Sequence, residues 1–156
     1  MPKQIDARAV QAVLYGVYKA LHSIAGASSA AIMRRAAPDI LEALGLFGVS
    51  LGNVSSVEKL QETLAETMVS AGCCDKMDFS LEGAKLTCKI TNCTFFDLTM
   101  ELKKKNIPPF GCPFAALTLA IADKALNKNA RVIFLEPTKG GMPGDTTLVV
   151  ELHDRA

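Results

Sequence analysis

The sequence predicts an α+β fold in which N-terminal helices are followed by a four-stranded antiparallel sheet, made of two hairpins with helices packed on it. In the first half of the chain, apolar residues recur at helical spacing. From residue 77 they alternate with polar residues, as in strands that bury one face. The 156 residues suffice for one core, and no internal repeat or interdomain linker is visible. We therefore expect a single domain over residues 1–156.

The first two helices are predicted from apolar spacing and from glycine and proline. One apolar stripe covers residues 10–24, and Gly26 ends that helix because glycine tolerates positive φ. The second helix begins near Ser28 or Ser29. It contains Pro38, which has no N–H group and crowds the preceding turn, so we expect a kink or two shorter helices. The stripe of the first helix consists of Val10, Val13, Leu14, Val17, Leu21 and Ile24.

A third helix and the first hairpin follow. Ser55 and Glu58 have the spacing of a capping box, in which the serine side chain accepts the N–H of the residue three positions on. Gly72 marks the end of this helix. Alternating apolar residues in segments 77–81 and 84–90 then predict two strands joined by a tight turn, with one face of the hairpin buried.

Two more helices and a second hairpin complete the predicted fold. Helical spacing returns over residues 94–105, where a proline pair ends the helix. An apolar helix over residues 114–126 opens with Pro113, which is tolerated in a first turn. The last two strands, 132–135 and 147–152, enclose a turn rich in glycine and proline.

Composition excludes several classes of protein. The formal net charge of +1, from 17 basic and 16 acidic residues, provides no electrostatic footprint for nucleic acid or an anionic membrane. No apolar run reaches the roughly 18 residues of a membrane span, and the N-terminus lacks the apolar stretch of a signal peptide. Five cysteines, two of them adjacent, fit free thiols in a reducing compartment better than a disulfide framework. We expect a cytoplasmic protein.

Two cysteines are separated by a helix-sized insert, so folding can bring their sulfur atoms together. They are Cys93 and Cys112. One interpretation is that both are buried thiols that behave as small hydrophobic groups. The other is a redox pair or a zinc or iron site, with Cys88 as third ligand. A structural zinc site normally has four ligands in close pairs, whereas this chain has no C-x-x-C and its two histidines lie at opposite ends, His22 and His153.

Phenylalanines gather on or beside predicted loops. Pockets for small molecules are mainly apolar with few polar groups, so these rings are candidates for ligand binding. Ordinary core packing is the alternative explanation. The candidate ligand-binding residues are Phe95, Phe96, Phe110 and Phe114.

From residue 28 to 152, the order and spacing of these features resembles the 4-vinyl reductase (hydrocarbon-binding) domain family. The shared features are a helical run of arginines and small residues, two cysteines around a charged insert, a strand ending in glutamate, and a Gly-Asp turn. They correspond to residues 32–37, Cys93, Cys112, Glu136 and Gly144-Asp145. Such domains are similar to transport-particle tethering subunits and the haem-NO-binding fold. The resemblance implies a small hydrophobic ligand and a homodimer formed through N-terminal helices.

The prediction is therefore a cytoplasmic, homodimeric module that binds a small hydrophobic molecule as a sensor, carrier or assembly factor. No Ser-His-Asp arrangement, metalloprotease helix or paired carboxylate site is recognisable, so we identify no catalytic residue and favour a non-enzymatic role. The alternative is a cysteine-based metal or thiol-redox protein that uses Cys93 and Cys112.

Overall fold

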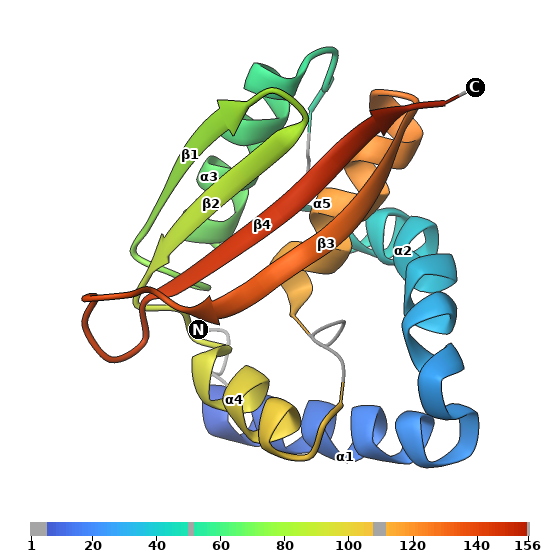
Figure 1. Ribbon diagram of the computed structural model, residues 1–156, viewed down its shortest axis with the longest axis vertical. Coiled ribbons are helices and arrows are strands. Elements are labelled where there is room, and N and C mark those ends of the chain that lie inside the picture. Colours follow the sequence, from blue (N-terminus) through green and yellow to red (C-terminus); the bar gives the residue numbers. More distant parts are fainter. Residues whose placement is uncertain (1–5, 50–51, 108–111, 156) are drawn as a thin grey trace.

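The computed structural model describes residues 6–49, 52–107 and 112–155. The chain forms an α+β fold with a four-stranded antiparallel sheet, which confirms the predicted fold class (Figure 1). The elements in chain order are α1 (Ala7–Ala25), the 3-10 helix η1 (Gly26–Ser28), α2 (Ser29–Leu46), α3 (Val57–Ser70), β1 (Lys76–Glu82), β2 (Lys85–Thr91), α4 (Phe96–Lys104), α5 (Pro113–Ala125), β3 (Lys128–Pro137) and β4 (Thr146–Asp154).

The sheet consists of two hairpins that meet at their inner strands. The strand order is β1-β2-β4-β3, so the two hairpins are joined by the pairing of β2 with β4. Cys88 lies at the centre of the sheet, opposite Phe79 on β1 and Leu148 on β4. The register of β3 against β4 shifts between Val132 and Phe134, which marks a β-bulge in the edge strand.

Helices α3 and α5 cover one face of the sheet (Figure 1). The side chains that point into this layer alternate along the two inner strands, β2 and β4, as the period-two pattern predicts. Burying one such aliphatic side chain contributes about 1.5–3 kcal/mol. The core of the layer includes Leu60 and Leu64 of α3, Leu86 and Ile90 of β2, Phe114 and Ile121 of α5, and Leu148 and Val150 of β4.

Helices α1 and α4 lie side by side at the end of the molecule below the sheet in Figure 1, and they have a small core of their own. Tyr18 of α1 packs there with Leu98, Leu102 and Ile107. The Gln11 side chain also donates a hydrogen bond of 2.6 Å to the backbone carbonyl of Thr94. Only one side of the predicted apolar stripe is therefore covered.

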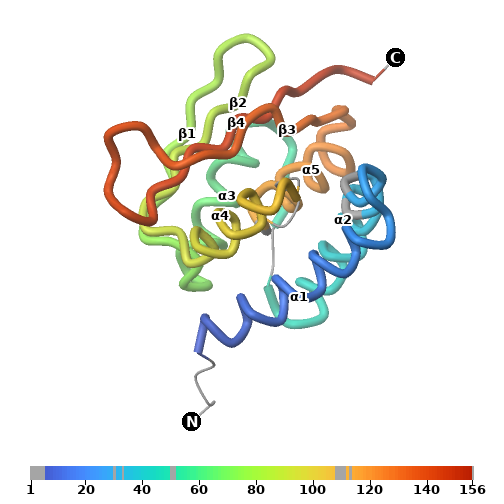
Figure 2. Tube along the Cα trace, turned by 60° about the horizontal axis from the view of Figure 1, so that its bottom comes forward, coloured from blue at the N-terminus to red at the C-terminus, as the bar shows by residue number. Residues whose placement is uncertain are grey.

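The uncovered side of α1 keeps most of the stripe in contact with solvent. Val13, Val17 and Ile24 are 66%, 56% and 86% exposed. Figure 2 shows the first turns of α1 at the margin of the molecule. The spacing of the stripe was predicted correctly, but the face that packs inward is the one centred on Tyr18.

Two local expectations are corrected, and one alternative is removed. Helix α2 runs from residue 29 to 46 as one element with Pro38 inside it, so of the two expected outcomes, a kink or two shorter helices, the second does not occur. The N-cap of α3 is Ser56 rather than Ser55, because the Ser56 hydroxyl accepts the N–H of Lys59 at 3.2 Å. Helix α4 begins at Phe96, two residues later than the apolar spacing suggested.

Candidate functional site

Four of the five cysteines are buried in the core between the sheet and the helices. They are Cys74, Cys88, Cys93 and Cys112. The fifth, Cys73, is half-buried and packs against the same core. Strand β2 places Cys88 on the inward face, and the turn after this strand carries the next thiol. The fold thus gathers all five thiols around one part of the core.

Backbone hydrogen bonds fix the positions of Cys93, which follows β2, and of Cys112, which precedes α5. The Cys93 N–H donates to the carbonyl of Gly144 at 2.9 Å, which ties the end of β2 to the β3–β4 turn. Cys112 is the N-cap residue of α5, and its carbonyl accepts the N–H of Ala116 at 3.1 Å. The cysteine at the start of α5 is therefore positioned by the helix that it begins.

Burial keeps these thiols protonated at neutral pH. Burial raises the pKa of the Cys112 thiol to about 11, although the backbone N–H groups of Ala115 and Phe114 act in the opposite direction. Burial, with a smaller contribution from Cys112, raises the pKa of Cys93 to about 12. The same two causes raise the pKa of Cys88 strongly. A thiolate is the form that attacks disulfides and binds metals, so the native environment opposes both reactions.

A metal centre requires several ligands at one point. Within residues 6–49, 52–107 and 112–155, no group of three or more His, Cys, Asp or Glu residues is arranged to hold a metal ion. The zinc or iron site predicted on Cys88, Cys93 and Cys112 thus stays a prediction, which would require the sulfur atoms to move together and lose their protons.

The predicted ligand-binding phenylalanines that the structure describes, Phe95, Phe96 and Phe114, have different surroundings. Phe114 is fully buried, and its ring packs edge-on against Phe95 with the ring centroids 6.5 Å apart, as in an ordinary core pair. Phe96 lines a separate surface hollow with Met100 and Pro137. Phe110 lies outside the described residues.

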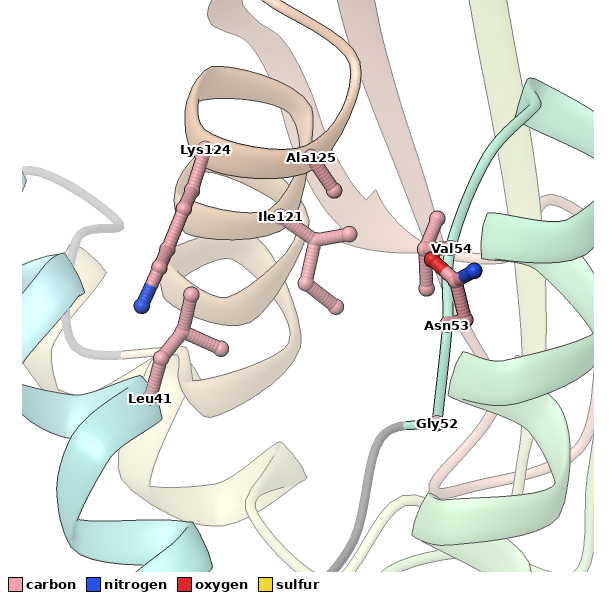
Figure 3. Close-up of a pocket in the computed structure, with 7 residues that line it drawn as sticks. All are labelled: Leu41, Gly52, Asn53, Val54, Ile121, Lys124 and Ala125. Atoms are coloured by element: carbon pink, nitrogen blue, oxygen red, sulfur yellow. The ribbon is translucent and has the colours of Figure 1, made fainter.

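A different pocket lies between α2, α5 and the segment that leads into α3 (Figure 3). Its volume is about 390 Å³. Leu41 comes from α2, and Val54 precedes α3 and faces Ile121 of α5 across the opening. The remaining lining residues are Gly52, Asn53, Lys124 and Ala125. Among the described lining residues, the walls thus combine aliphatic side chains with the amide of Asn53 and the ammonium group of Lys124.

Sequence reasoning missed this pocket because its walls are brought together by tertiary packing. One local signal was present: Ile121, Lys124 and Ala125 have i, i+3 and i+4 spacing and so share a face of α5. On an apolar helix this face combines two small or aliphatic side chains with a charge. The segment that completes the pocket, Gly52 to Val54, has no periodic pattern of its own.

Comparisons with known proteins found a matching family model, a related sequence and a similar solved structure. The family model described as "Putative rubredoxin C-terminal domain" matches residues 10–137. An uncharacterized protein of Methanocaldococcus jannaschii is 25% identical over 131 residues, which are 84% of this chain and 79% of the relative. A crystal structure of trafficking protein particle complex subunit 3 from Naegleria fowleri, covalently bound to palmitic acid, aligns with a TM-score of 0.43 and 12% identity, over 98% of this chain and 87% of that chain. The likeness to 4-vinyl reductase domains remains a resemblance.

Among the described residues, no helix has the length and apolar character needed to cross a membrane.

Proposed function

This chain belongs to the rubredoxin C-terminal domain family, and from that premise we propose that it is a non-enzymatic homodimeric module that binds a small hydrophobic molecule. The observation that carries the proposal is the pocket between Leu41, Val54 and Ile121. Its size falls within the range of about 300–1,000 Å³ that is usual for small-molecule sites. The role of such a module is that of a sensor, carrier or assembly factor.

The chemistry of the pocket walls favours binding over catalysis. Ile121 is 3% exposed and Val54 is 7% exposed, so the core behind them holds both side chains in place. A ligand gains about 25 cal/mol for each Å² that it removes from water on the more exposed apolar lining, half-buried Leu41 and exposed Ala125. Because the walls are already in place, little ordering of the protein opposes binding.

A neutral fluorescent probe, N-phenyl-1-naphthylamine, tests the proposal by its increase in emission on entering an apolar site. Ala125→Phe fills the pocket from the exposed last turn of α5 without disturbing the core. Ala71→Phe, at the exposed C-cap of α3, is the matched control. We expect binding by the wild type and the control and a loss of at least tenfold in affinity for Ala125→Phe. Equal affinities of all three proteins, or no binding by the wild type, would overturn the proposal.

The uncovered side of α1 supports the homodimer. Val10, Val13, Val17, Ala20 and Ile24 recur at spacings of three, four, three and four residues, which is the seam pattern of paired helices. All five side chains are exposed. A second copy of α1 can cover this seam with its own, because a two-fold interface is self-complementary.

A second candidate function is thiol redox chemistry at Cys93 and Cys112. The observation that favours it is that both thiols are buried in the same core cluster. Oxidation by a peroxide would form one S–S bond, with the two thiol protons and two electrons passing to the peroxide to give water and an alcohol or a second water.

Thiol titration after peroxide treatment, together with metal analysis, decides this second candidate. The expected result for a redox pair is a loss of two titratable thiols, reversed by dithiothreitol and absent in Cys112→Ser. Stoichiometric zinc or iron that is lost in Cys112→Ser would instead support the metal site on Cys88, Cys93 and Cys112. Five unchanged thiols and no metal would leave the cysteines as core residues and remove this candidate.

A further inference from the structure

The charge at the rim of the pocket identifies the class of molecule that fits it. Among the described residues that line the pocket, Lys124 is the one that carries a charge, and its side chain is exposed. No hydrogen bond or ion pair recorded within the described residues involves it. Its neighbour Asp123 is paired with Arg155, so that carboxylate is already neutralised. The ammonium group of Lys124 therefore remains available at the mouth of an apolar cavity.

The position of Lys124 relative to the apolar walls favours a ligand that has an anionic group at one end and an apolar body. Figure 3 shows its stem running along α5 toward Leu41, while Asn53 and Val54 stand on the other side of the opening beyond Ile121. An anionic group beside the ammonium can thus stay in contact with water while an apolar body extends across Ile121. Lysine suits this arrangement because its long apolar stem packs on the wall and its head remains solvated.

The dipole of α5 opposes the positive charge of Lys124 only in part. Lys124 lies in the last turn of α5, where the helix carries a partial negative charge equivalent to about half an electron. A full positive charge on the ammonium exceeds it. Asn53, the other polar side chain on the rim, has an amide that can donate a hydrogen bond to an anion and carries no opposing charge. Lys124 and Asn53 can therefore both present N–H donors to an anion at the rim.

We propose that the pocket selects an amphipathic monoanion, an aliphatic chain with one terminal carboxylate. In this proposal the ammonium group of Lys124 binds the carboxylate. This inference rests on the ligand-binding function proposed above. It adds that a neutral or cationic molecule of the same chain length binds more weakly. A charge-assisted hydrogen bond at a partly desolvated rim corresponds to a preference of about tenfold.

The test compares three probes of equal chain length, octanoate, 1-octanol and octylamine, by isothermal titration calorimetry. Wild-type protein is expected to bind octanoate about tenfold more tightly than 1-octanol. Lys124→Met keeps the apolar stem and removes the charge, so the two affinities should become equal. Lys124→Arg keeps the charge and should keep the preference. Lys124→Glu should reverse the order and favour octylamine.

The outcomes separate this inference from the function on which it rests. Equal affinities of the wild type for octanoate and 1-octanol, or an octanoate preference that survives in Lys124→Met, overturn the role of Lys124 and leave hydrophobic binding intact. Ala125→Phe is the control that tests whether the probes bind in this pocket, and it should lower the affinity for all three probes. If it weakens none, or if no probe binds the wild type, both the inference and the proposed function fail.

Discussion

Asp145 and Asn92 are joined by a hydrogen bond across 53 positions of the chain: the Asn92 backbone N–H donates to the Asp145 Oδ1 at 3.1 Å. The other carboxylate oxygen accepts the Met142 N–H at 3.0 Å. The Asn92 side chain in turn donates to Asp75 at 3.0 Å. Three turns from different parts of the sequence are therefore held together at the end of the sheet where Cys93 enters the core.

Replacing Asp145 with alanine removes two of these hydrogen bonds at once. Because the lost acceptor is a carboxylate, we expect the free energy of unfolding to fall by about 1–3 kcal/mol. Urea denaturation followed by circular dichroism measures the change. Lys139→Ala, in the same turn, alters an exposed side chain and should stay within about 0.5 kcal/mol of the wild type. Equal destabilisation by both variants would contradict the role assigned to Asp145.

Thiol reactivity should follow burial. Cys73 is half-buried, whereas the other four thiols are buried. We expect one thiol to react rapidly with 5,5′-dithiobis(2-nitrobenzoate) at pH 8 and four to react only after unfolding, because burial withholds both access and the thiolate form. Cys73→Ser should abolish the rapid phase. A rapid phase of two or more thiols in the native protein would show that the core opens more readily than its packing indicates.

Stability should decline at alkaline pH because of the buried thiols. Their ordinary pKa is near 9, and burial raises the pKa of Cys112 to about 11 and that of Cys93 to about 12. As pH rises, these thiols lose their protons in the unfolded chain before they do so in the folded protein. Their contribution to the free energy of unfolding is therefore constant well below pH 9 and falls as pH rises toward 11. Each thiol contributes up to about 1.4 kcal/mol per pH unit in this range.

Melting temperatures measured from pH 7 to pH 11 test this expectation in matched variants. Cys112→Ala removes one titrating thiol and should flatten the decline above pH 9. Cys73→Ala, at the half-buried site, should have a smaller effect on the slope because less burial separates its native and unfolded pKa values. Identical slopes for both variants and the wild type would mean that other groups govern alkaline unfolding.

The α1 seam should govern the oligomeric state. Val17→Asp places a charge at the centre of the exposed apolar stripe, where it would have to be buried without a partner in a dimer. We expect a shift from dimer to monomer in analytical ultracentrifugation, with an unchanged circular dichroism spectrum. Val69→Asp makes the same change at an exposed position of α3 and should leave the dimer intact. A monomeric wild-type protein would remove the homodimer proposal.

The order and type of the elements could be predicted from the sequence because each follows from a local pattern. The period-two segments of β1 and β2 bury one face, and their alternation specifies both the strands and the buried side of Cys88. The cap of α3 was misplaced by one residue because Ser55 and Ser56 are chemically equivalent, and only the folded chain shows that Ser56 accepts the Lys59 N–H.

The candidate site could not be predicted in the same way. Periodicity shows that α1 has an apolar stripe, but the choice between Tyr18 and Val17 as the inward residue depends on where α4 lies. The pocket depends on three segments from distant parts of the chain. The candidate phenylalanines share a residue type rather than a spacing pattern, and the structure shows that Phe95 and Phe114 pack against each other at the core.

The bulge in β3 also limits how copies of this protein can associate. The pairing with β4 passes from Val132–Val150 directly to Phe134–Val149, so Ile133 has no partner in the ladder. Because β3 is an edge strand, a foreign strand that tried to extend the sheet would meet a break in the row of N–H and C=O groups at this residue. The irregular edge thus disfavours the addition of a strand at β3, on the side of the sheet opposite β1.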